Sequence, residues 1–288
     1  MDPDFVLASI PSRYQQQPNS VANAIRCFQA AHPPTADLQL KAFAFPQSRP
    51  KIWACLVRYG EHLETRSELC LEFAEGPCTN EELRDLLFLL EATKEPLTLY
   101  CIEDSRMALV VSVLSEFGRT ERLHEAELPD YTVSEAKWPE LLQLDIQPPN
   151  GYCWDAPKPS EAAHIASLWP HVGIVNDSEE LCYAFKLRHY PHICLRTLEG
   201  ELAAFEMTSP QGCCQHLFTL PAHRRRGLGS LVELKLAQVH IQHGIRPWKT
   251  VLVDNPEAMA LCQASDWWQP SGLLRWWLGF EPSSNSTN

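Results

Sequence analysis

The sequence predicts an α/β protein built from two units. Apolar residues recur at helical spacing in several segments, and short apolar runs of strand length lie between these segments. The chain of 288 residues has room for one large domain or two of medium size, and its hydrophobic fraction of 45% is normal for a folded protein. A proline-rich stretch at residues 128–159 separates the two units.

The first unit, residues 1–127, alternates helices and strands. Asn19 is the expected N-cap of a first helix, because its side-chain oxygen can accept from the free N–H groups of the first turn. Thr79 and Glu82 have the spacing of a capping box at the start of a second helix. The predicted helices are 20–31, 80–92 and 107–117, and the predicted strands are 38–45, 52–59, 69–73 and 97–102. No catalytic-looking carboxylate pair, glycine-rich loop or His/Cys cluster stands out in this unit.

Residues 128–159 are expected to be a linker and packing strap. Prolines occur here at positions 129, 139, 148, 149, 157 and 159. Proline fixes φ and removes a backbone donor, which disfavours regular structure.

The second unit, residues 160–288, contains an antiparallel meander followed by a loop and a buried helix. Asn255 can cap a later helix that has Pro256 at its first position, where the missing N–H costs nothing. The predicted helices are 160–169, 178–189, 227–243 and one after Asn255; the predicted strands are 193–197, 202–207, 213–220, 250–253 and 273–280.

The stretch LFTLPAHRRRGLGS, residues 217–230, indicates an anion site. The first turn of a helix has free N–H groups and the positive end of the helix dipole, and glycines allow a phosphate to approach the backbone. Arg224, Arg225 and Arg226 add positive charge directly before Gly227 and Gly229. The spacing is neither that of the P-loop nor that of the three-glycine dinucleotide motif. A solvated basic turn at the start of an ordinary helix is the simpler alternative.

Composition excludes several classes of protein. The net charge of −12 and the pI near 5.4 argue against non-specific nucleic-acid binding, so the arginines are a local feature. No run approaches the ~18 apolar residues of a membrane span. Asp2 and Asp4 lie where a targeting signal would be positive. The eleven cysteines contain no C-x-x-C, which favours free thiols in a reducing, cytoplasmic compartment and no metal site.

Two motifs in the second unit resemble those of the GNAT superfamily of acyl-CoA N-acyltransferases. The first is the strand, R-x-x-G-x-G loop and helix at residues 217–230, and the second is Asn255-Pro-Glu-Ala258-Met-Ala-Leu261-Cys262. More narrowly, YPHICLRTLEGELAAFEMTSPQG, TLPAHRRRGLGSLVELKLAQ and VLVDNPEAM are similar to the glycine N-acyltransferase-like family. The resemblance is clear over residues 190–259. It implies an α+β architecture of two tandem GNAT-like domains, of which the N-terminal one is degenerate, each a mixed, mostly antiparallel sheet flanked by helices.

The resemblance implies acyl-CoA as co-substrate and a small amine or amino acid, such as glycine, as acceptor. It also admits a mitochondrial location, although no clear transit peptide is seen. The residues expected to hold the coenzyme are Leu217, Phe218, Thr219, Arg224, Arg225, Arg226, Gly227, Leu228, Gly229, Ser230 and Asn255. The first three would offer backbone groups to the pantetheine arm, and the loop would bind the diphosphate.

Two positions depart from the superfamily pattern. Cys213 stands where many members carry a general-base glutamate, and Cys262 replaces the tyrosine that often protonates the departing thiolate; Asp266 replaces a later glycine. Acyl transfer still needs a base and a proton donor. His216, with an ordinary pKa of about 6.5, is the first candidate base, Glu206 is the second, and Cys262 is the candidate acid. Each of them also fits a plain structural role.

These observations leave two main hypotheses, an acyl-CoA:amine N-acyltransferase and a coenzyme-binding or interaction protein of the same fold that is weak or inactive in catalysis. Nucleic-acid binding through the arginines is a third hypothesis, and the acidic background argues against it.

Overall fold

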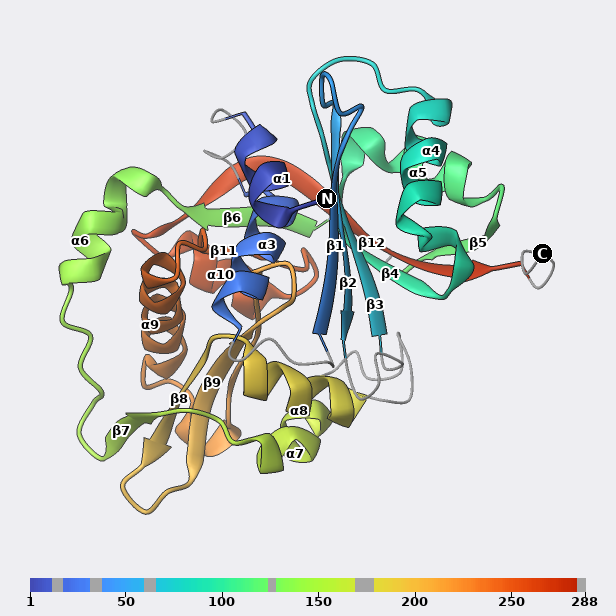
Figure 1. Cartoon of the computed structure of the whole chain (residues 1–288). Helices are drawn as coiled ribbons and strands as arrows, with labels where there is room; N and C mark the ends of the chain where they lie inside the picture. The colour runs from blue at the N-terminus through green and yellow to red at the C-terminus, as the bar shows by residue number, and fades with distance from the viewer. Residues whose placement is uncertain (12–17, 32–37, 60–65, 124–127, 169–178, 284–288) are drawn as a thin grey trace.

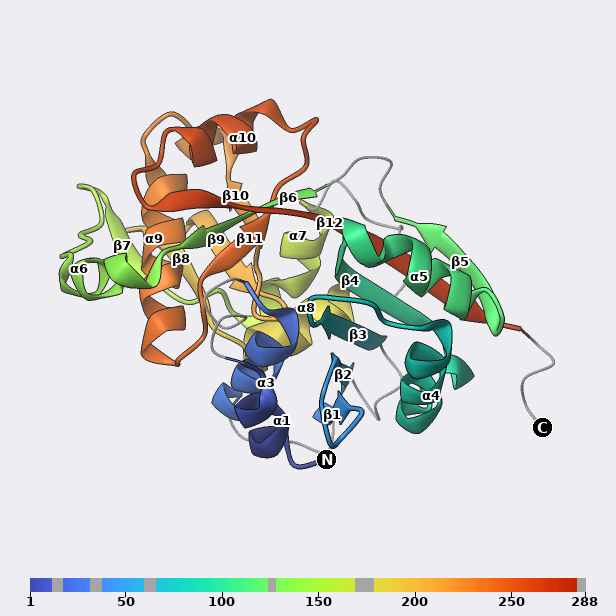
Figure 2. The same cartoon turned by 90° about the horizontal axis from the view of Figure 1, so that it is seen from above.

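The computed structural model describes residues 1–11, 18–31, 38–59, 66–123, 128–168 and 179–283, which form two α/β halves (Figure 1). Helices α4 and α5 lie on the outer side of the N-terminal sheet, while α1 and α3 lie on the side that faces the C-terminal half (Figures 1 and 2). The elements of the N-terminal half are α1 (Pro3–Ser9), α3 (Ser20–Ala30), β1 (Leu38–Phe45), β2 (Ile52–Tyr59), β3 (Arg66–Phe73), α4 (Asn80–Leu90), β4 (Leu97–Glu103), α5 (Asp104–Leu114) and β5 (Gly118–Arg122).

The C-terminal half contains a smaller sheet and the longest helix described. Its elements are β6 (Leu128–Val133), α6 (Trp138–Gln143), β7 (Tyr152–Asp155), α7 (Ala162–Ser167), α8 (Glu179–His189), β8 (His192–Thr197), β9 (Leu202–Thr208), β10 (Cys214–Thr219), α9 (Leu228–Gln242), β11 (Trp248–Thr250), α10 (Pro256–Gln263) and β12 (Trp268–Pro282). No helix among these described elements is long and apolar enough to cross a membrane.

Two sheets organise the chain. The larger has the strand order β1-β2-β3-β4-β12-β6-β11, with β5 also paired to β12, and the smaller has the order β10-β9-β8-β7. All pairs are antiparallel except β3 and β4, which run parallel. Both sheets are therefore mixed or antiparallel and covered by helices, as the resemblance implied.

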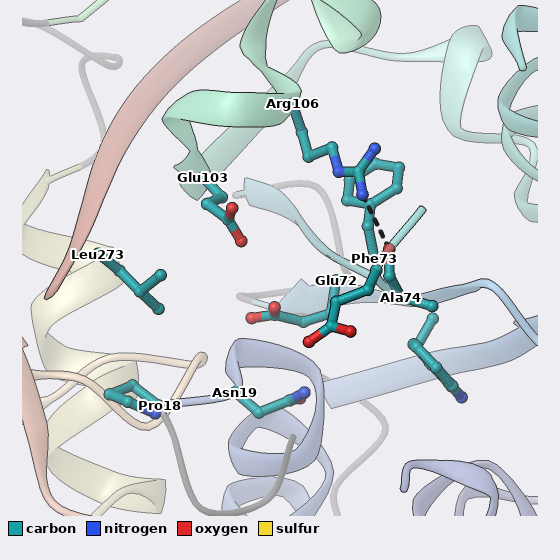
Figure 3. A pocket seen from close by; sticks show the side chains of 10 residues that line it. Pro18, Asn19, Glu72, Phe73, Ala74, Glu103, Arg106 and Leu273 are labelled. Atoms are coloured by element: carbon teal, nitrogen blue, oxygen red, sulfur yellow. Dashed lines mark hydrogen bonds between the residues drawn. The ribbon is translucent and has the colours of Figure 1, made fainter. Parts of the chain in front are cut away.

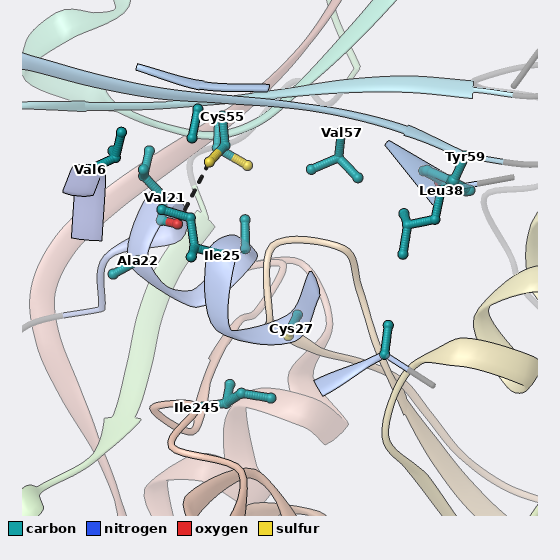
Figure 4. Close-up of a cluster of buried hydrophobic side chains, with 14 of the residues drawn as sticks. Val6, Val21, Ala22, Ile25, Cys27, Leu38, Cys55, Val57, Tyr59 and Ile245 are labelled. Carbon is teal, nitrogen blue, oxygen red and sulfur yellow. Dashed lines mark hydrogen bonds between the residues drawn. The ribbon is translucent and has the colours of Figure 1, made fainter. Parts of the chain in front are cut away.

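Helix α3 joins the halves. Its apolar side packs on β1 to β3, where the thiol of Cys55 approaches the carbonyl of Val21 at 3.9 Å (Figure 4). On the opposite side, the Asn23 amide donates to the carbonyl of Arg246 at 2.9 Å and accepts from its N–H at 3.2 Å. Because these backbone groups are buried, the amide satisfies polar atoms that would otherwise destabilise the contact.

The predicted helix starts are confirmed where capping residues signalled them. Asn19 accepts from the N–H of Ala22 at 2.8 Å, and Thr79 and Glu82 form both bonds of a capping box. Helix α5 begins three residues earlier than predicted and also ends earlier, at Leu114. The predicted helix ends at Trp169 and Ser178 lie outside the described residues.

Two predictions about regular structure are wrong. The proline-rich stretch contains strands β6 and β7. Pro129 is the second residue of β6, near the strand end where a missing N–H is tolerated, and the ladder of β6 with β12 shifts its register between Pro270 and Leu274. The strand predicted at residues 250–253 is instead β11, residues 248–250, which pairs with β6.

The last strand, β12, continues the sheet of the N-terminal half. It pairs with β4 and β5 through its C-terminal part and with β6 through its N-terminal part (Figure 2). The division of the chain at residues 127 and 160 stays a prediction, but the sheet of the N-terminal half contains β12, the last strand of the chain.

Candidate active site

Strand β10 carries a bulge at the centre of the predicted site. Its ladder with β9 is regular at Gln215 and again at Phe218, and the register shifts between them. His216 lies within this shift and has a φ of 56°, in the left-handed region. A bulge bends its strand and re-aims side chains, and bulges are frequent beside active sites. On β9, the residue opposite the bulge is Glu206.

Beyond the bulge, the chain enters helix α9 without a side-chain cap. Gly227, the N-cap, has a φ of 74° and no space constraint around its Cα, so its backbone conformation is what requires glycine. The first N–H groups of α9 therefore have no side-chain acceptor. A helix N-terminus in this state, open to solvent at Ser230, is an anion-binding arrangement.

The start of α9 lies against the end of β10. A Cβ placed on Gly229 would be 3.5 Å from the Thr219 hydroxyl and 3.9 Å from the Leu217 side chain. The structure thus brings together the strand residues and the loop glycines that the sequence predicted as one site.

The three arginines are exposed but differ in their contacts. Arg224 donates from Nε to the carbonyl of Thr219 at 3.0 Å. Arg226 donates to the Tyr152 hydroxyl at 2.7 Å. Within the part of the chain that the structure describes, the Arg225 guanidinium contacts no acceptor. Arg225 is therefore the most available to an anion, whereas the other two would first exchange contacts with the protein.

Tyr152 is a residue of this loop that the sequence did not indicate. It lies on β7, and its hydroxyl also approaches Nδ1 of His223 at 3.0 Å. A tyrosine in a stretch expected to be a linker gave no signal of a contact with a loop more than 70 residues away.

Strands β10 and β11 present their free edges to each other. Each is the edge strand of its own sheet. Near the start of β10 the two strands approach each other, where the backbone of Thr250 lowers the pKa of the Cys213 thiol. No ladder joins them, so backbone groups of these described edges remain available to an extended ligand with amide groups. Asn255, beyond β11, uses its side chain to cap α10 at the N–H of Ala258, 3.1 Å away.

His216 faces the helices α7 and α8. Its ring packs edge-on against Phe205, Tyr183 and Phe218, with centroid separations of 5.1, 5.3 and 6.4 Å, and the residue is 4% exposed. These rings belong to the apolar cluster between this sheet and α7 and α8.

Glu206 faces the opposite side of the sheet. Because successive strand residues alternate, it points away from the Phe205 side, toward α9 and β11. It is 1% exposed, and its Oε2 has no hydrogen-bond partner among the residues that the structure describes. Burial, with a further contribution from Glu233, raises its pKa well above the ordinary value. Burial therefore favours the neutral form of Glu206, and the two candidate bases are not on the same face.

Glu206 and the candidate acid Cys262 meet a buried ion pair that the sequence analysis missed. Lys249 of β11 bonds to Glu233 of α9, and both side chains are nearly inaccessible. The Lys249 ammonium lies 4.4 Å from the centroid of the Trp268 ring, and its charge opposes the rise in the pKa of the Cys262 thiol that burial causes. A glutamate within an otherwise apolar helix face and a lysine in an apolar strand were the only sequence signals.

Burial favours the protonated form of both cysteines that differ from the superfamily pattern, Cys213 and Cys262. Burial raises the pKa of Cys213 to about 12. Burial also raises the pKa of Cys262, and Lys249 opposes that shift. Cys213 therefore cannot replace a carboxylate base, whereas Cys262 can carry a proton to give away.

The N-terminal half has a related crevice with the opposite charge. Strands β3 and β4 pair only at Glu68 with Thr98 and at Leu69 with Leu99, and beyond this point a pocket of about 170 Å³ lies between the strand ends. Its lining includes Glu72, Glu75 and Glu103, and Figure 3 shows the carboxylates of Glu72 and Glu103 toward the space.

This crevice does not offer a diphosphate site. Arg106 donates to the carbonyls of Ala74 and Gly76 at 2.8 and 3.1 Å and so fills the turn after β3. The N-terminus of α4 is already closed by its capping box. Carboxylates, a capped helix and an engaged arginine all disfavour an anion here.

Comparison with solved structures shows the fold of the whole chain. The chain is similar to a Drosophila protein of known X-ray structure, with 17% identity, a TM-score of 0.72 and coverage of 98% of this chain and 97% of that one. It is similar to a tandem GNAT protein from the clavulanic acid biosynthesis pathway, with 14% identity, a TM-score of 0.54 and coverage of 98% and 97%. The chain has the tandem GNAT fold.

The C-terminal half carries the sequence similarity. The family model of FR47-like protein matches residues 193–264, from β8 to the end of α10. A GCN5-related N-acetyltransferase from Kribbella flavida is also similar, with 17% identity, a TM-score of 0.50 and coverage of 90% of this chain and 94% of that one. No curated protein matches the chain. The matched residues of the tandem GNAT fold include the bulge, the arginine loop, Lys249 and Cys262.

Proposed function

We propose that this protein is an N-acyltransferase that moves an acyl group from acyl-CoA to the amine of glycine or of another small amino acid or amine. The observation that carries the proposal is the uncapped, glycine-started N-terminus of α9 beside exposed arginines, at the end of an unpaired strand edge. The tandem GNAT fold and the FR47-like match support acyl transfer. The glycine N-acyltransferase-like motifs are the basis for the acceptor class.

The coenzyme would enter along the facing edges of β10 and β11. Its diphosphate would accept from the N–H groups at Gly227 to Ser230, with Arg225 as the nearest free cation. The amides of its pantetheine arm would pair with the backbone of Leu217 to Thr219, and its thioester would lie toward the end where Cys213 and Thr250 meet.

For the chemistry, His216 is the better of the two candidate bases. It lies in the bulge of β10, and its ring can take the proton of the attacking amine directly or through water. Glu206 is the weaker candidate because burial favours its neutral form, which cannot accept the proton of the amine. Cys262 is the candidate donor for the departing thiolate.

The enclosure of His216 by aromatic rings favours a second candidate function. A base that no solvent or substrate reaches would leave a protein that binds the coenzyme but transfers slowly or not at all. The two hypotheses share the coenzyme site and differ in turnover.

Coenzyme binding is tested by titration calorimetry with CoA and acetyl-CoA. Arg225→Ala should weaken binding about tenfold and leave the melting temperature unchanged, because the exposed side chain has no hydrogen bond or ion pair with the described residues that it could lose. Arg119→Ala, which removes an exposed arginine on β5 of the other half, is the matched control and should bind as the wild type does. No binding by the wild type at millimolar coenzyme would reject the proposal.

Turnover is tested by release of free CoA thiol from acetyl-, benzoyl- and longer acyl-CoA in the presence of an amino-acid panel. The enzyme hypothesis predicts thiol release with at least one amine and its loss in His216→Ala. Coenzyme binding without release across the panel would favour the inactive binding protein.

A further inference from the structure

Tyr152, His223 and Arg226 form a chain of hydrogen bonds beside the arginine loop. The guanidinium of Arg226 donates to the Tyr152 hydroxyl at 2.7 Å, and that hydroxyl lies 3.0 Å from Nδ1 of His223. The other ring nitrogen of His223, Nε2, lies 3.5 Å from a carboxylate oxygen of Glu201. Tyr152 and His223 are 8% and 6% exposed, whereas Arg226 and Glu201 are exposed. The chain therefore connects the surface at the proposed diphosphate site to a buried imidazole.

The donors in this chain determine where its protons lie. A guanidinium only donates, so the Tyr152 oxygen accepts the bond from Arg226, and the tyrosine proton is left for Nδ1 of His223. Nδ1 is then an unprotonated acceptor, and the neutral ring carries its proton on Nε2. Among the described residues Nε2 has no hydrogen-bond partner, and the group that it faces is the Glu201 carboxylate. A proton on Nε2 is attracted by this neighbour, whereas a bare lone pair would be repelled.

A phosphate at the arginine loop would compete for these hydrogen bonds. Hydrogen bonds to a charged group are roughly twice as strong as those between neutral groups, so Arg226 and the Tyr152 hydroxyl both bind more strongly to a phosphate than to each other or to His223. Nδ1 of His223 then loses its donor. A buried acceptor without a partner costs free energy, and the ring avoids this cost by taking a proton on Nδ1 and donating to the Tyr152 oxygen. Glu201 and the bound phosphate stabilise the positive charge of the ring.

We propose that Tyr152 binds a phosphate of the coenzyme and that His223 is a positioning residue that takes up a proton when the coenzyme binds. This inference rests on the proposed function and deepens it, because it adds two residues and one proton to the binding reaction. In the free protein, the Tyr152 hydroxyl donates to a neutral His223. In the complex, that hydroxyl donates to the phosphate and accepts from Nδ1 of the imidazolium, and the added proton comes from the solvent.

The charged and titratable groups around His223 are compatible with this change. Among the described residues, those that contact its ring or the tyrosine hydroxyl are Tyr152 on β7, Glu201 at the turn between β8 and β9, and Arg226 in the loop. Arg224 is directed at a backbone carbonyl of β10 instead. Arg226 is the cation of this group that opposes an imidazolium, and in the complex its charge is paired with the phosphate.

Proton uptake makes the affinity for the coenzyme depend on pH. A histidine changes its charge between about pH 5 and 8. Because the complex holds more protons at His223 than the free protein does, the affinity should rise as the pH falls. The phosphates of the coenzyme also titrate, so the quantity that tests the inference is the difference between the wild type and a variant that lacks the imidazole.

Titration calorimetry with CoA in two buffers of different ionisation enthalpy gives the number of protons taken up per coenzyme bound. At pH 7 the wild type should take up about half a proton or more beyond the number taken up by His223→Asn. Asparagine places an amide oxygen near the Tyr152 hydroxyl but cannot be protonated, so this variant removes the charge and keeps an acceptor. His164→Asn, which replaces an exposed histidine on α7, is the matched control and should take up as many protons as the wild type.

The affinities give the second readout. Between pH 8 and pH 6, the wild type should gain about tenfold in CoA affinity relative to His223→Asn, because only the wild type couples a histidine proton to binding. Tyr152→Phe keeps the buried ring and removes the hydroxyl. It should bind CoA several-fold more weakly at pH 8 and lose most of the additional proton uptake, because nothing then links His223 to the phosphate.

Equal proton uptake by the wild type and His223→Asn would overturn the inference. A free protein whose His223 carries its proton on Nδ1 would overturn it as well, and the ring ¹⁵N shifts, assigned by their loss in His223→Asn, report this without any coenzyme. Absence of CoA binding by the wild type would reject the proposed function and this inference with it. Binding with equal proton uptake rejects the inference alone.

Discussion

At the scale of single residues, the two glycines of the arginine loop have different physical roles. Gly227 has a positive φ with open space around it, whereas a side chain on Gly229 would point at the end of β10. The backbone conformation favours glycine at position 227, and the space needed by a ligand favours glycine at position 229.

Gly227→Ala should lower the free energy of unfolding by about 1–2 kcal/mol, the cost of a left-handed alanine. Gly229→Ala should change stability by less than about 0.5 kcal/mol but weaken CoA binding several-fold, because its methyl group would lie beside Thr219. Urea unfolding and calorimetric titration of both variants separate the two effects. Equal stability of Gly227→Ala and the wild type would contradict the backbone argument.

Residues also show where sequence reasoning stops. The capping roles of Asn19, Thr79 and Asn255 are local, so they could be read from neighbours along the chain, and all three are confirmed. The roles of Tyr152 and Lys249 depend on partners 74 and 16 residues away, and no pattern in their own neighbourhoods indicates those contacts.

At the scale of elements, helix α9 is anchored to its sheet by a neutral histidine. His240 is fully buried, with Nε2 2.7 Å from the Thr208 hydroxyl on β9 and Nδ1 3.6 Å from the Cys214 sulfur on β10. Burial, with a smaller effect of His243, lowers its pKa to about 3. The helix is therefore held by a buried ring whose charged form would lose its hydration.

This anchor should make folding sensitive to acid. The pKa of His240 is lower in the folded than in the unfolded state. Its contribution to the free energy of unfolding is therefore fully present above about pH 6.5 and is lost as the pH falls from there toward 3. At pH 5 the loss should be about 2 kcal/mol. Urea unfolding of the wild type and of His240→Gln at pH 7 and pH 5 isolates the contribution of His240, because the buried carboxyls contribute equally to both proteins. If the free energy of unfolding changes with pH equally in the wild type and the variant, the role of His240 is contradicted.

At the scale of the whole molecule, β12 ties the halves together. Its residues Trp276, Leu278 and Phe280 belong to the core between the N-terminal sheet and the helices α4 and α5. Near its middle, the fully buried Arg275 bonds to Asp130 of β6 at 3.1 Å and to the carbonyl of Pro18 at 2.9 Å. The halves should therefore unfold as one cooperative unit.

Leu278→Ala should lower the free energy of unfolding by about 2–5 kcal/mol, because the residue is 1% exposed, whereas Leu274→Ala on the same strand, 38% exposed, should have little effect. Native-state amide exchange should accelerate in β3 and β4 and also in β8 and β9 of the Leu278 variant. Acceleration confined to the N-terminal half would show that the halves unfold independently.

The sequence by itself determined the α/β class, most element positions, the helix caps and the arginine loop, because each depends on residues a few positions apart. The tertiary structure alone decided which sheet received β12, why strands form in the proline-rich stretch, and that His216 and Glu206 lie on opposite faces. It also brought Lys249, Glu233 and Cys262 together. These outcomes depend on strand pairing and burial between distant segments, and such contacts leave no periodic trace in the sequence.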